Sequence, residues 1–306
     1  MHYSVGLPTH DVDHVDEFCT ADAVAEMSNA AEAAGFDAVN VTDHPFPEDD
    51  WLATGGHHAL EPLIALSFAG AATRRLRLLT HIYVLPYRNP FLAAKAALSL
   101  DVLSGGRLIL GVAAGYLEPE FEALGADFAH RNEVLDDAIV AMKAAWTQDH
   151  VVFEGRGFRA RGNTMRPRPV AHPHPPVWVG GNSARAVRRA VEHGQGWAPF
   201  PNPPESAARR RTAPMSSVDA VAARIVEARE HAARIGRTEP LDVCFAPVRF
   251  ARLGTDRGYG PEVREEIDAL AAAGVTWSTI GFGADSRAEW IERAGAFGEE
   301  VIAPTR

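Results

Sequence analysis

The chain has 306 residues, 46% of them apolar, and a formal net charge of -10 with its 13 histidines counted as neutral. A net charge this acidic argues against a nucleic-acid-binding surface and gives no reason to expect attraction to anionic membranes, so we expect neither as a partner. Its two cysteines, Cys19 and Cys244, are too few for a disulfide framework or a zinc knuckle, and we expect a protein of the reducing cytoplasm.

The chain begins with an acidic, histidine-rich segment, MHYSVGLPTHDVDH, and not with a basic and then apolar leader. Short β-branched runs then alternate with longer alanine-rich amphipathic runs, the pattern of repeated βα units. We expect eight strands, at about residues 3–7, 38–42, 76–85, 108–113, 177–179, 197–199, 243–248 and 276–280. Eight parallel strands close a TIM-type (β/α)8 barrel, so the predicted fold is one α/β barrel domain over residues 1–306.

Recognisable stops delimit the helical runs between these strands. The run from Asp22 is followed by Gly35, which favours a left-handed helix end, and Asn89 stands where a later helix should begin. Two segments interrupt the alternation, an insertion of about residues 150–176 between strands four and five and a proline-rich run over 199–217 after strand six. Such excursions normally belong to the loops over one end of a barrel.

The fifth predicted strand ends in VWVGGNS, residues 177–183. A strand that enters a helix through Gly180 and Gly181 leaves backbone N–H groups without intrahelical partners, and the missing Cβ atoms let a ligand approach them. A phosphate fits such a turn. The other interpretation is a tight turn before a helix that Asn182 or Ser183 caps, because the run is neither a dinucleotide fingerprint nor a Walker loop.

Two histidines follow or interrupt predicted strands. His44, in VNVTDHPFP after strand two, would face the mouth of a barrel, where an imidazole can exchange a proton near neutral pH. A surface turn capped by Asp43 is the alternative. Thr80 and His81, in LLTHIYVLPYRNP, are polar residues inside a strand-like run, which indicates either a bulge beside a ligand or a hydrogen-bonded interior histidine.

Strand four ends in the small residues Ala113, Ala114 and Gly115, which would let a flat ligand approach, and Tyr116 follows them. Two pairs of potential metal ligands occur in the sequence, Glu118 with Glu122 and His172 with His174. Neither pair has the context of a metal site, so we predict none.

As an ordered set, these motifs resemble the luciferase-like monooxygenase superfamily, and most closely its actinobacterial branch of coenzyme F420-dependent oxidoreductases. The resemblance spans about residues 3–300 and is strongest over 76–200. It rests on TDH, LPYRNP, GGRLILGVAAGYLEPEFEALGADFAHRNEVLDDAI, AWTQDHVVFEGRGFRA, MRPRPV and PPVWVGGNSARAVRRAVEHGQGWAP.

The resemblance implies a barrel that binds a deazaflavin or flavin across its carboxyl face. In the family, the turn matching VWVGGNS holds the cofactor phosphate, the position matching His44 faces the ring, and a bulged third strand backs the ring. Relatives often have a small residue at the position of His81 and a tryptophan at that of Tyr116, so substrate identity does not transfer. The resemblance implies catalytic roles for His44 and Tyr116 and cofactor contacts for Thr80, His81, Ile82, Ala113, Gly115, Gly180, Gly181, Asn182, Ser183 and Trp197.

The main function implied is hydride transfer between coenzyme F420 and a small organic substrate. The alternative is an FMN-dependent monooxygenase that uses oxygen and a separate flavin reductase, and a metal-dependent barrel hydrolase or a non-catalytic flavin carrier is less favoured. Relatives commonly dimerise through their second and third helices. The faces LIALSFAGAAT and LAAKAALSLDV are rich enough in alanine to pack closely, so we expect a homodimer.

Overall fold

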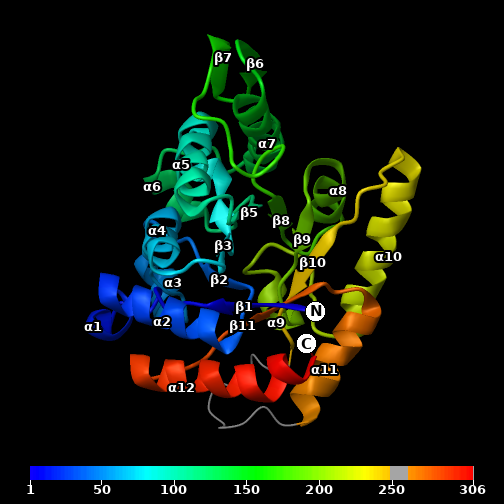
Figure 1. Cartoon of the computed structure of the whole chain (residues 1–306). Coiled ribbons are helices and arrows are strands. Elements are labelled where there is room, and N and C mark those ends of the chain that lie inside the picture. The colour runs from blue at the N-terminus through cyan, green and yellow to red at the C-terminus, as the bar shows by residue number, and fades with distance from the viewer. Residues whose placement is uncertain (249–260, 306) are drawn as a thin grey trace.

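The computed structural model of the chain describes residues 1–248 and 261–305. Its central feature is a parallel sheet that runs in the order β3-β2-β1-β11-β10-β9-β8-β5 and closes where β5 pairs with β3. The predicted TIM-type barrel is therefore confirmed (Figure 1). The barrel strands are β1 (His2–Gly6), β2 (Ala38–Val41), β3 (Arg77–Thr80) with its short continuation β4 (Tyr83–Val84), β5 (Leu108–Ala113), β8 (Val177–Gly180), β9 (Gly196–Ala198), β10 (Asp242–Phe245) and β11 (Trp277–Ile280).

The third strand differs from the continuous run predicted over 76–85. It is split into β3 and β4 by His81 and Ile82, which are joined by a cis peptide bond. β3 pairs with both β2 and β5, whereas β4 pairs with β5. Gly111 of β5 lies against this break, and a Cβ there would be 2.1 Å from the Thr80 carbonyl oxygen, so the close approach of the two strands requires glycine.

Helices surround the barrel, and the apolar core lies mostly between them and the strands. The predicted stop at Gly35 is confirmed by its left-handed conformation, and Asn89 caps its helix as expected, whereas the helix before Gly35 is capped by Thr20. The longer helices are α2 (Ala21–Ala34), α4 (Pro62–Ala72), α5 (Pro90–Ser104), α7 (Arg131–Thr147), α8 (Ala184–His193), α10 (Val218–Ile235), α11 (Pro261–Ala273) and α12 (Arg287–Phe297).

Shorter helical turns lie in the loops and at the end of the chain. They are α1 (Val15–Phe18), α3 (Asp49–Ala53), η1 (Leu85–Tyr87), α6 (Glu118–Ala123), α9 (Pro204–Ala207), η3 (Gly298–Ile302) and η4 (Ala303–Thr305). Of all the helices formed by the described residues, none is long and apolar enough to cross a membrane.

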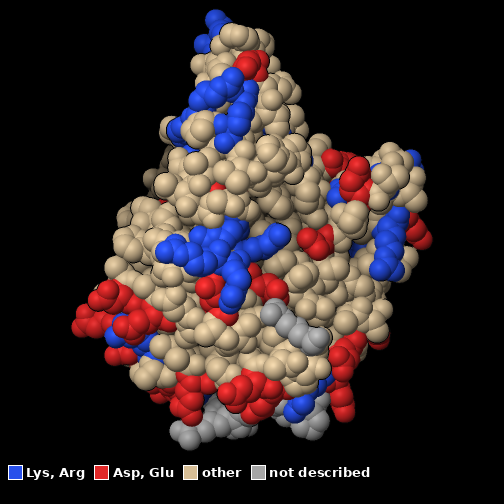
Figure 2. Space-filling view, viewed as in Figure 1, with Lys and Arg blue, Asp and Glu red and all other residues tan. Residues whose placement is uncertain are grey.

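A two-stranded antiparallel hairpin interrupts the βα alternation between β5 and β8. It consists of β6 (Val151–Gly155) and β7 (Phe158–Asn163), contacts α7, and projects from the top of the molecule in Figure 1. On the face shown in Figure 2, basic side chains lie at the tip over this hairpin, and acidic side chains gather along the lower edge over α1, α2 and α12. The net charge of -10 is therefore unevenly distributed.

Candidate active site

The carboxyl ends of the barrel strands surround a cleft of about 490 Å³. In a parallel barrel the side chains that follow each strand meet at this end, which is why segments far apart in the sequence line one cavity. Contributions come from the ends of β2, β4, β5, β8 and β9, and from the loop after β9. Predicted site residues that line it are His44, His81, Ile82, Ala113, Gly115, Tyr116, Gly180, Gly181 and Ser183.

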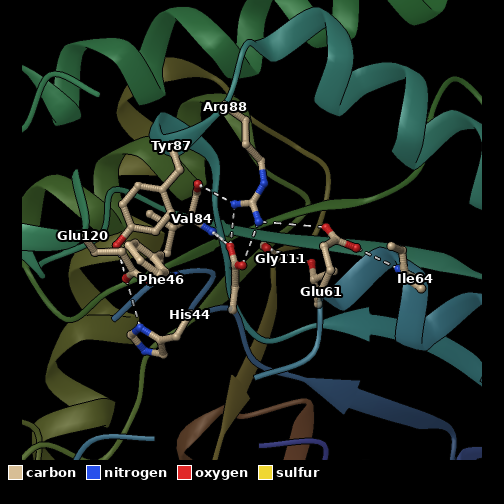
Figure 3. A network of polar contacts seen from close by, with 11 residues as sticks. His44, Phe46, Glu61, Ile64, Val84, Tyr87, Arg88, Gly111 and Glu120 are labelled. Carbon is tan, nitrogen blue, oxygen red and sulfur yellow. Dashed lines mark hydrogen bonds and ion pairs between the residues drawn. The ribbon is translucent and has the colours of Figure 1, made fainter. Parts of the chain in front are cut away.

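His44 follows β2 and is held by a buried carboxylate. Its Nδ1 lies 3.2 Å from Oε2 of Glu120, a residue of α6 whose side chain is fully buried. The same Oε2 accepts a 2.7 Å hydrogen bond from the Tyr87 hydroxyl, and Oε1 accepts a 2.8 Å bond from the backbone N–H of Phe46 (Figure 3). Burial opposes ionisation of Glu120, but these donors outweigh it and keep the pKa of its carboxyl below the ordinary value.

Asp43, the residue before His44, anchors the same turn. Its carboxylate accepts two hydrogen bonds from the Arg88 guanidinium, at 2.7 and 2.8 Å, and a third from the backbone N–H of Val84 at 2.8 Å (Figure 3). The end of β2 is thereby tied to β4 and to the segment that follows it. Because His44 is the next residue, the position of its ring depends on this ion pair.

Aromatic rings pack around His44, and two of them, His57 and Tyr116, line the cleft. Trp51 lies with its ring centre 4.4 Å from the imidazole, His57 stands perpendicular at 4.9 Å, and Tyr116 stands edge-on at 6.1 Å. Burial lowers the pKa of His57 to about 4, so its ring is neutral near pH 7. Burial also raises the pKa of the Tyr116 hydroxyl, although Arg210 opposes the shift, so Tyr116 is protonated in neutral solution.

The glycine turn after β8, beside the end of β5, also lines the cleft. A Cβ at Gly180 would lie 2.7 Å from the Ile82 side chain, and Gly181 has a φ of 108°, a conformation that side-chain-bearing residues rarely adopt. Ser183 caps the ten-residue helix α8, as one of the two sequence interpretations required. The two interpretations of the turn, a phosphate site and a helix cap, are compatible, because the turn still lines the cleft while Ser183 caps the helix.

Three of the predicted cofactor contacts lie outside the cleft lining. The Thr80 hydroxyl donates to the Gly111 carbonyl at 2.8 Å, and the Trp197 indole donates to the Gly181 carbonyl at 2.9 Å. The fully buried Asn182 amide holds the backbone of Phe200 through both its oxygen and its nitrogen. These side chains support the cleft from behind, and contact with a cofactor through them stays a prediction.

Several arginine side chains line the cleft. Arg185 and Arg189 pair with Asp136, and Arg211 pairs with Glu118. Within residues 1–248 and 261–305, no carboxylate lies within ion-pair distance of two further arginines of the lining, Arg131 and Arg210. In a protein with a net charge of -10, two such cations in one cleft favour an anionic ligand.

The residues present fit a flavin-type cofactor. The small residues Ala113, Ala114 and Gly115 and the glycines after β8 leave room for a flat ring, and the arginines suit a phosphate at one end. No three side chains among His, Cys, Asp and Glu of the described residues are grouped closely enough to hold a metal ion. His174, one of the histidines considered for a metal, is buried against Trp146, where its Nδ1 contacts the Pro175 carbonyl.

Glu120, whose carboxylate contacts His44, was not singled out by the sequence. The residues singled out in its helix were Glu118, which pairs with Arg211, and Glu122, which is exposed. A usable signal was present, since Glu120 follows Leu117 by three residues and adjoins Phe121, and both of these apolar residues are buried. A glutamate on the apolar face of a helix needs a partner inside the protein.

Comparison with known proteins agrees with this geometry. The family model described as luciferase-like monooxygenase matches residues 1–213. An uncharacterized protein of Mycobacterium tuberculosis is 30% identical over 229 residues, which is 71% of this chain and 74% of that protein.

Two solved structures have the same fold over the whole chain. The monooxygenase RslO1 of Streptomyces bottropensis superimposes with a TM-score of 0.78 at 21% identity and covers 100% of both chains. The coenzyme F420-dependent tetrahydromethanopterin reductase of Methanopyrus kandleri gives 0.74 at 15% identity and covers 100% of this chain and 99% of that one.

Proposed function

The chain belongs to the luciferase-like monooxygenase family, and from that premise we propose that it is an oxidoreductase dependent on coenzyme F420. The observation that carries the proposal is the set of residues that meet in one cleft. His44 and Tyr116 line it together with the glycine turn, several arginines and the small residues at the end of β5. F420 has an anionic side chain with carboxylates in addition to its phosphate, which suits Arg131 and Arg210.

When bound, the deazaflavin would supply a carbon that accepts or donates hydride. The chain's own residues provide the rest of the chemistry. Gly180, Gly181 and the start of α8 would hold the phosphate, and Ile82 would support the ring from the barrel side. His44 would exchange the coupled proton with a small organic substrate, and Tyr116, whose ring stands edge-on beside it, would assist.

Titration of the apo-protein with F420 and, separately, with FMN tests this assignment. Each titration follows the fluorescence of the added ligand as it enters the cleft. We expect F420 to bind at least tenfold more tightly than FMN, a difference of about 1.4 kcal/mol. Tighter binding of FMN, or binding of neither compound, would contradict the proposal.

The second candidate is an FMN-dependent monooxygenase supplied with reduced flavin by a separate reductase. It is favoured by the likeness to the monooxygenase RslO1, which superimposes slightly better than the F420-dependent reductase. The single phosphate of FMN needs fewer cations than this cleft provides, so we place the FMN-dependent monooxygenase second. Oxygen consumption that depends on added FMN, NADH and a flavin reductase would identify it.

We propose further that the protein is a cytoplasmic homodimer. Cys19 and Cys244 are free cysteines, which is compatible with a reducing compartment. The outer faces of α4 and α5 carry exposed apolar side chains, with Phe68 49% and Leu92 73% exposed. Neighbouring large apolar residues on two adjacent helices favour burial against a second copy of the chain.

A further inference from the structure

We propose that Glu120 is a positioning residue that fixes the protonation of the His44 ring, with the proton on Nδ1 and a free electron pair on Nε2. The structure places its carboxylate 3.2 Å from Nδ1, inside the protein. This inference deepens the proposed function, and it rests on that function only for the role of the proton in catalysis. The state of the ring itself is a property of the apo-protein.

The argument starts from the donors around the Glu120 carboxylate. Its Oε1 accepts from the backbone N–H of Phe46, and its Oε2 accepts from the Tyr87 hydroxyl. Tyr87 stays protonated, because burial and the adjacent carboxylate raise the pKa of its hydroxyl far above the ordinary value. Both donors favour the carboxylate over the carboxylic acid, and an ionised Glu120 can only accept hydrogen bonds.

The remaining contact of Glu120 Oε2, with Nδ1 of His44, must then also be with a hydrogen-bond donor. A carboxylate that only accepts can meet Nδ1 of His44 favourably only if that nitrogen carries a hydrogen. This determines the tautomer of the neutral ring, and it leaves Nε2 as the basic atom. Figure 3 shows Nδ1 directed at Glu120 and the second ring nitrogen directed away from the network.

Two consequences follow for proton transfer in the cleft. When a substrate O–H bond breaks, its electron pair stays on the substrate oxygen and the proton passes to Nε2 of His44. The imidazolium formed is stabilised by the Glu120 carboxylate beside it, and the reverse transfer returns the proton from Nε2. The neighbouring glutamates cannot replace this group, because Glu118 pairs with Arg211 and Glu122 lies on the exposed face of α6.

Nitrogen-15 NMR of the histidine-labelled apo-protein at pH 8 tests the ring state directly. The His44 signals are assigned as those lost in His44→Gln. We expect Nδ1 of His44 in the wild type to have the shift of a protonated nitrogen and Nε2 that of an unprotonated one. The opposite pattern, or an average of the two tautomers, would overturn the proposal without any variant of Glu120.

The variant Glu120→Gln gives a second, independent measurement. The Phe46 N–H requires the amide oxygen of the new glutamine, so the amide nitrogen must face His44 and donate to Nδ1. We expect the tautomer to switch, with the hydrogen moving to Nε2. Tyr87→Phe, which removes a donor but keeps the carboxylate, and the exposed control Glu122→Gln should both keep the wild-type tautomer. An unchanged His44 tautomer in Glu120→Gln overturns the proposal.

Activity with the bound cofactor adds a kinetic readout. We expect Glu120→Gln to lower kcat by roughly 10- to 100-fold, below the roughly 10²–10⁴-fold range for loss of the acid–base group itself, with KM nearly unchanged. Glu122→Gln should retain wild-type kcat. Failure of F420 binding would overturn the proposed function and leave the NMR result intact, whereas a wild-type tautomer in Glu120→Gln would overturn only the role of Glu120.

Discussion

Asp43 and Arg88 form a two-point ion pair that connects the end of β2 to the segment after β4. The two guanidinium nitrogens lie 2.7 and 2.8 Å from the two carboxylate oxygens, and the Asp43 side chain is 1% exposed. Arg88 also lies 3.9 Å from Glu61 and over the face of Tyr83. One ion pair therefore holds the turn that carries the proposed catalytic histidine.

Replacing Arg88 by methionine should destabilise the fold, because Asp43 would keep a buried charge with only the Val84 N–H to stabilise it. We expect a loss of roughly 3–5 kcal/mol in the free energy of unfolding, the usual effect of removing one partner of a buried pair. Urea denaturation measures it. The exposed Arg188→Met on α8 serves as the control and should change stability by less than about 0.5 kcal/mol. Equal stability of the two variants would show that the pair contributes little.

His44→Ala should lower turnover by roughly 10²–10⁴-fold while cofactor affinity stays near the wild-type value, because the ring exchanges a proton and does not hold the phosphate. Steady-state kinetics and the F420 titration measure the two effects separately. His58→Ala, which changes an exposed histidine outside the cleft lining, should leave both unchanged. Undiminished turnover in His44→Ala would remove His44 from the mechanism.

Gly181→Val should weaken cofactor binding by about tenfold or more, equivalent to about 1.4 kcal/mol. A side chain at φ 108° strains the turn, and its Cβ would lie 3.3 Å from the Ala186 side chain at the start of α8. Gly236→Val is the matched control, because it strains an equally left-handed position at the end of α10, away from the cleft. The phosphate assignment is wrong if both variants bind F420 as the wild type does.

Acid should destabilise the protein through His81. Burial lowers the pKa of its ring from 6.5 to about 4 in the folded chain, so the unfolded chain binds more protons between these values. The contribution of the neutral, buried His81 ring to stability is therefore fully present above about pH 6.5, and it is lost as the pH falls toward 4. We expect His81→Gln to flatten the stability profile over this window in thermal unfolding. The exposed His58→Gln should leave the wild-type slope, and an unchanged slope in both would exclude His81 as its source.

A charge on the outer face of α4 should dissociate the proposed dimer. Phe68→Glu would place an unpaired carboxylate in an apolar interface, which is costly to bury. Sedimentation velocity should show a dimer for the wild type and a monomer for the variant. Val226→Glu on α10, where the valine is 51% exposed, should remain dimeric. A monomeric wild type would contradict the expectation.

The glycine turn illustrates how far local sequence reasoning reached. Its position after the fifth predicted strand and before a capped helix is confirmed, since β8 ends at Gly180 and Ser183 caps α8. Local sequence could not decide whether the Asn182 side chain faces a ligand, because that depends on which distant segments pack around it. The structure places its amide behind the cleft, against the backbone of Phe200 and Ala213, because the loop after β9 folds over it.

The sequence by itself determined the barrel, the helix boundaries at Gly35 and Asn89, and the position of His44 after the second strand, because hydrophobic periodicity and turn residues act over a few neighbouring positions. The tertiary structure alone decided the partners of that histidine. Glu120 is 76 residues from His44, and Arg88 is 45 residues from Asp43. Periodicity reports which face of a helix is buried, but the group it meets there is fixed only when the closed barrel brings the ends of distant strands together.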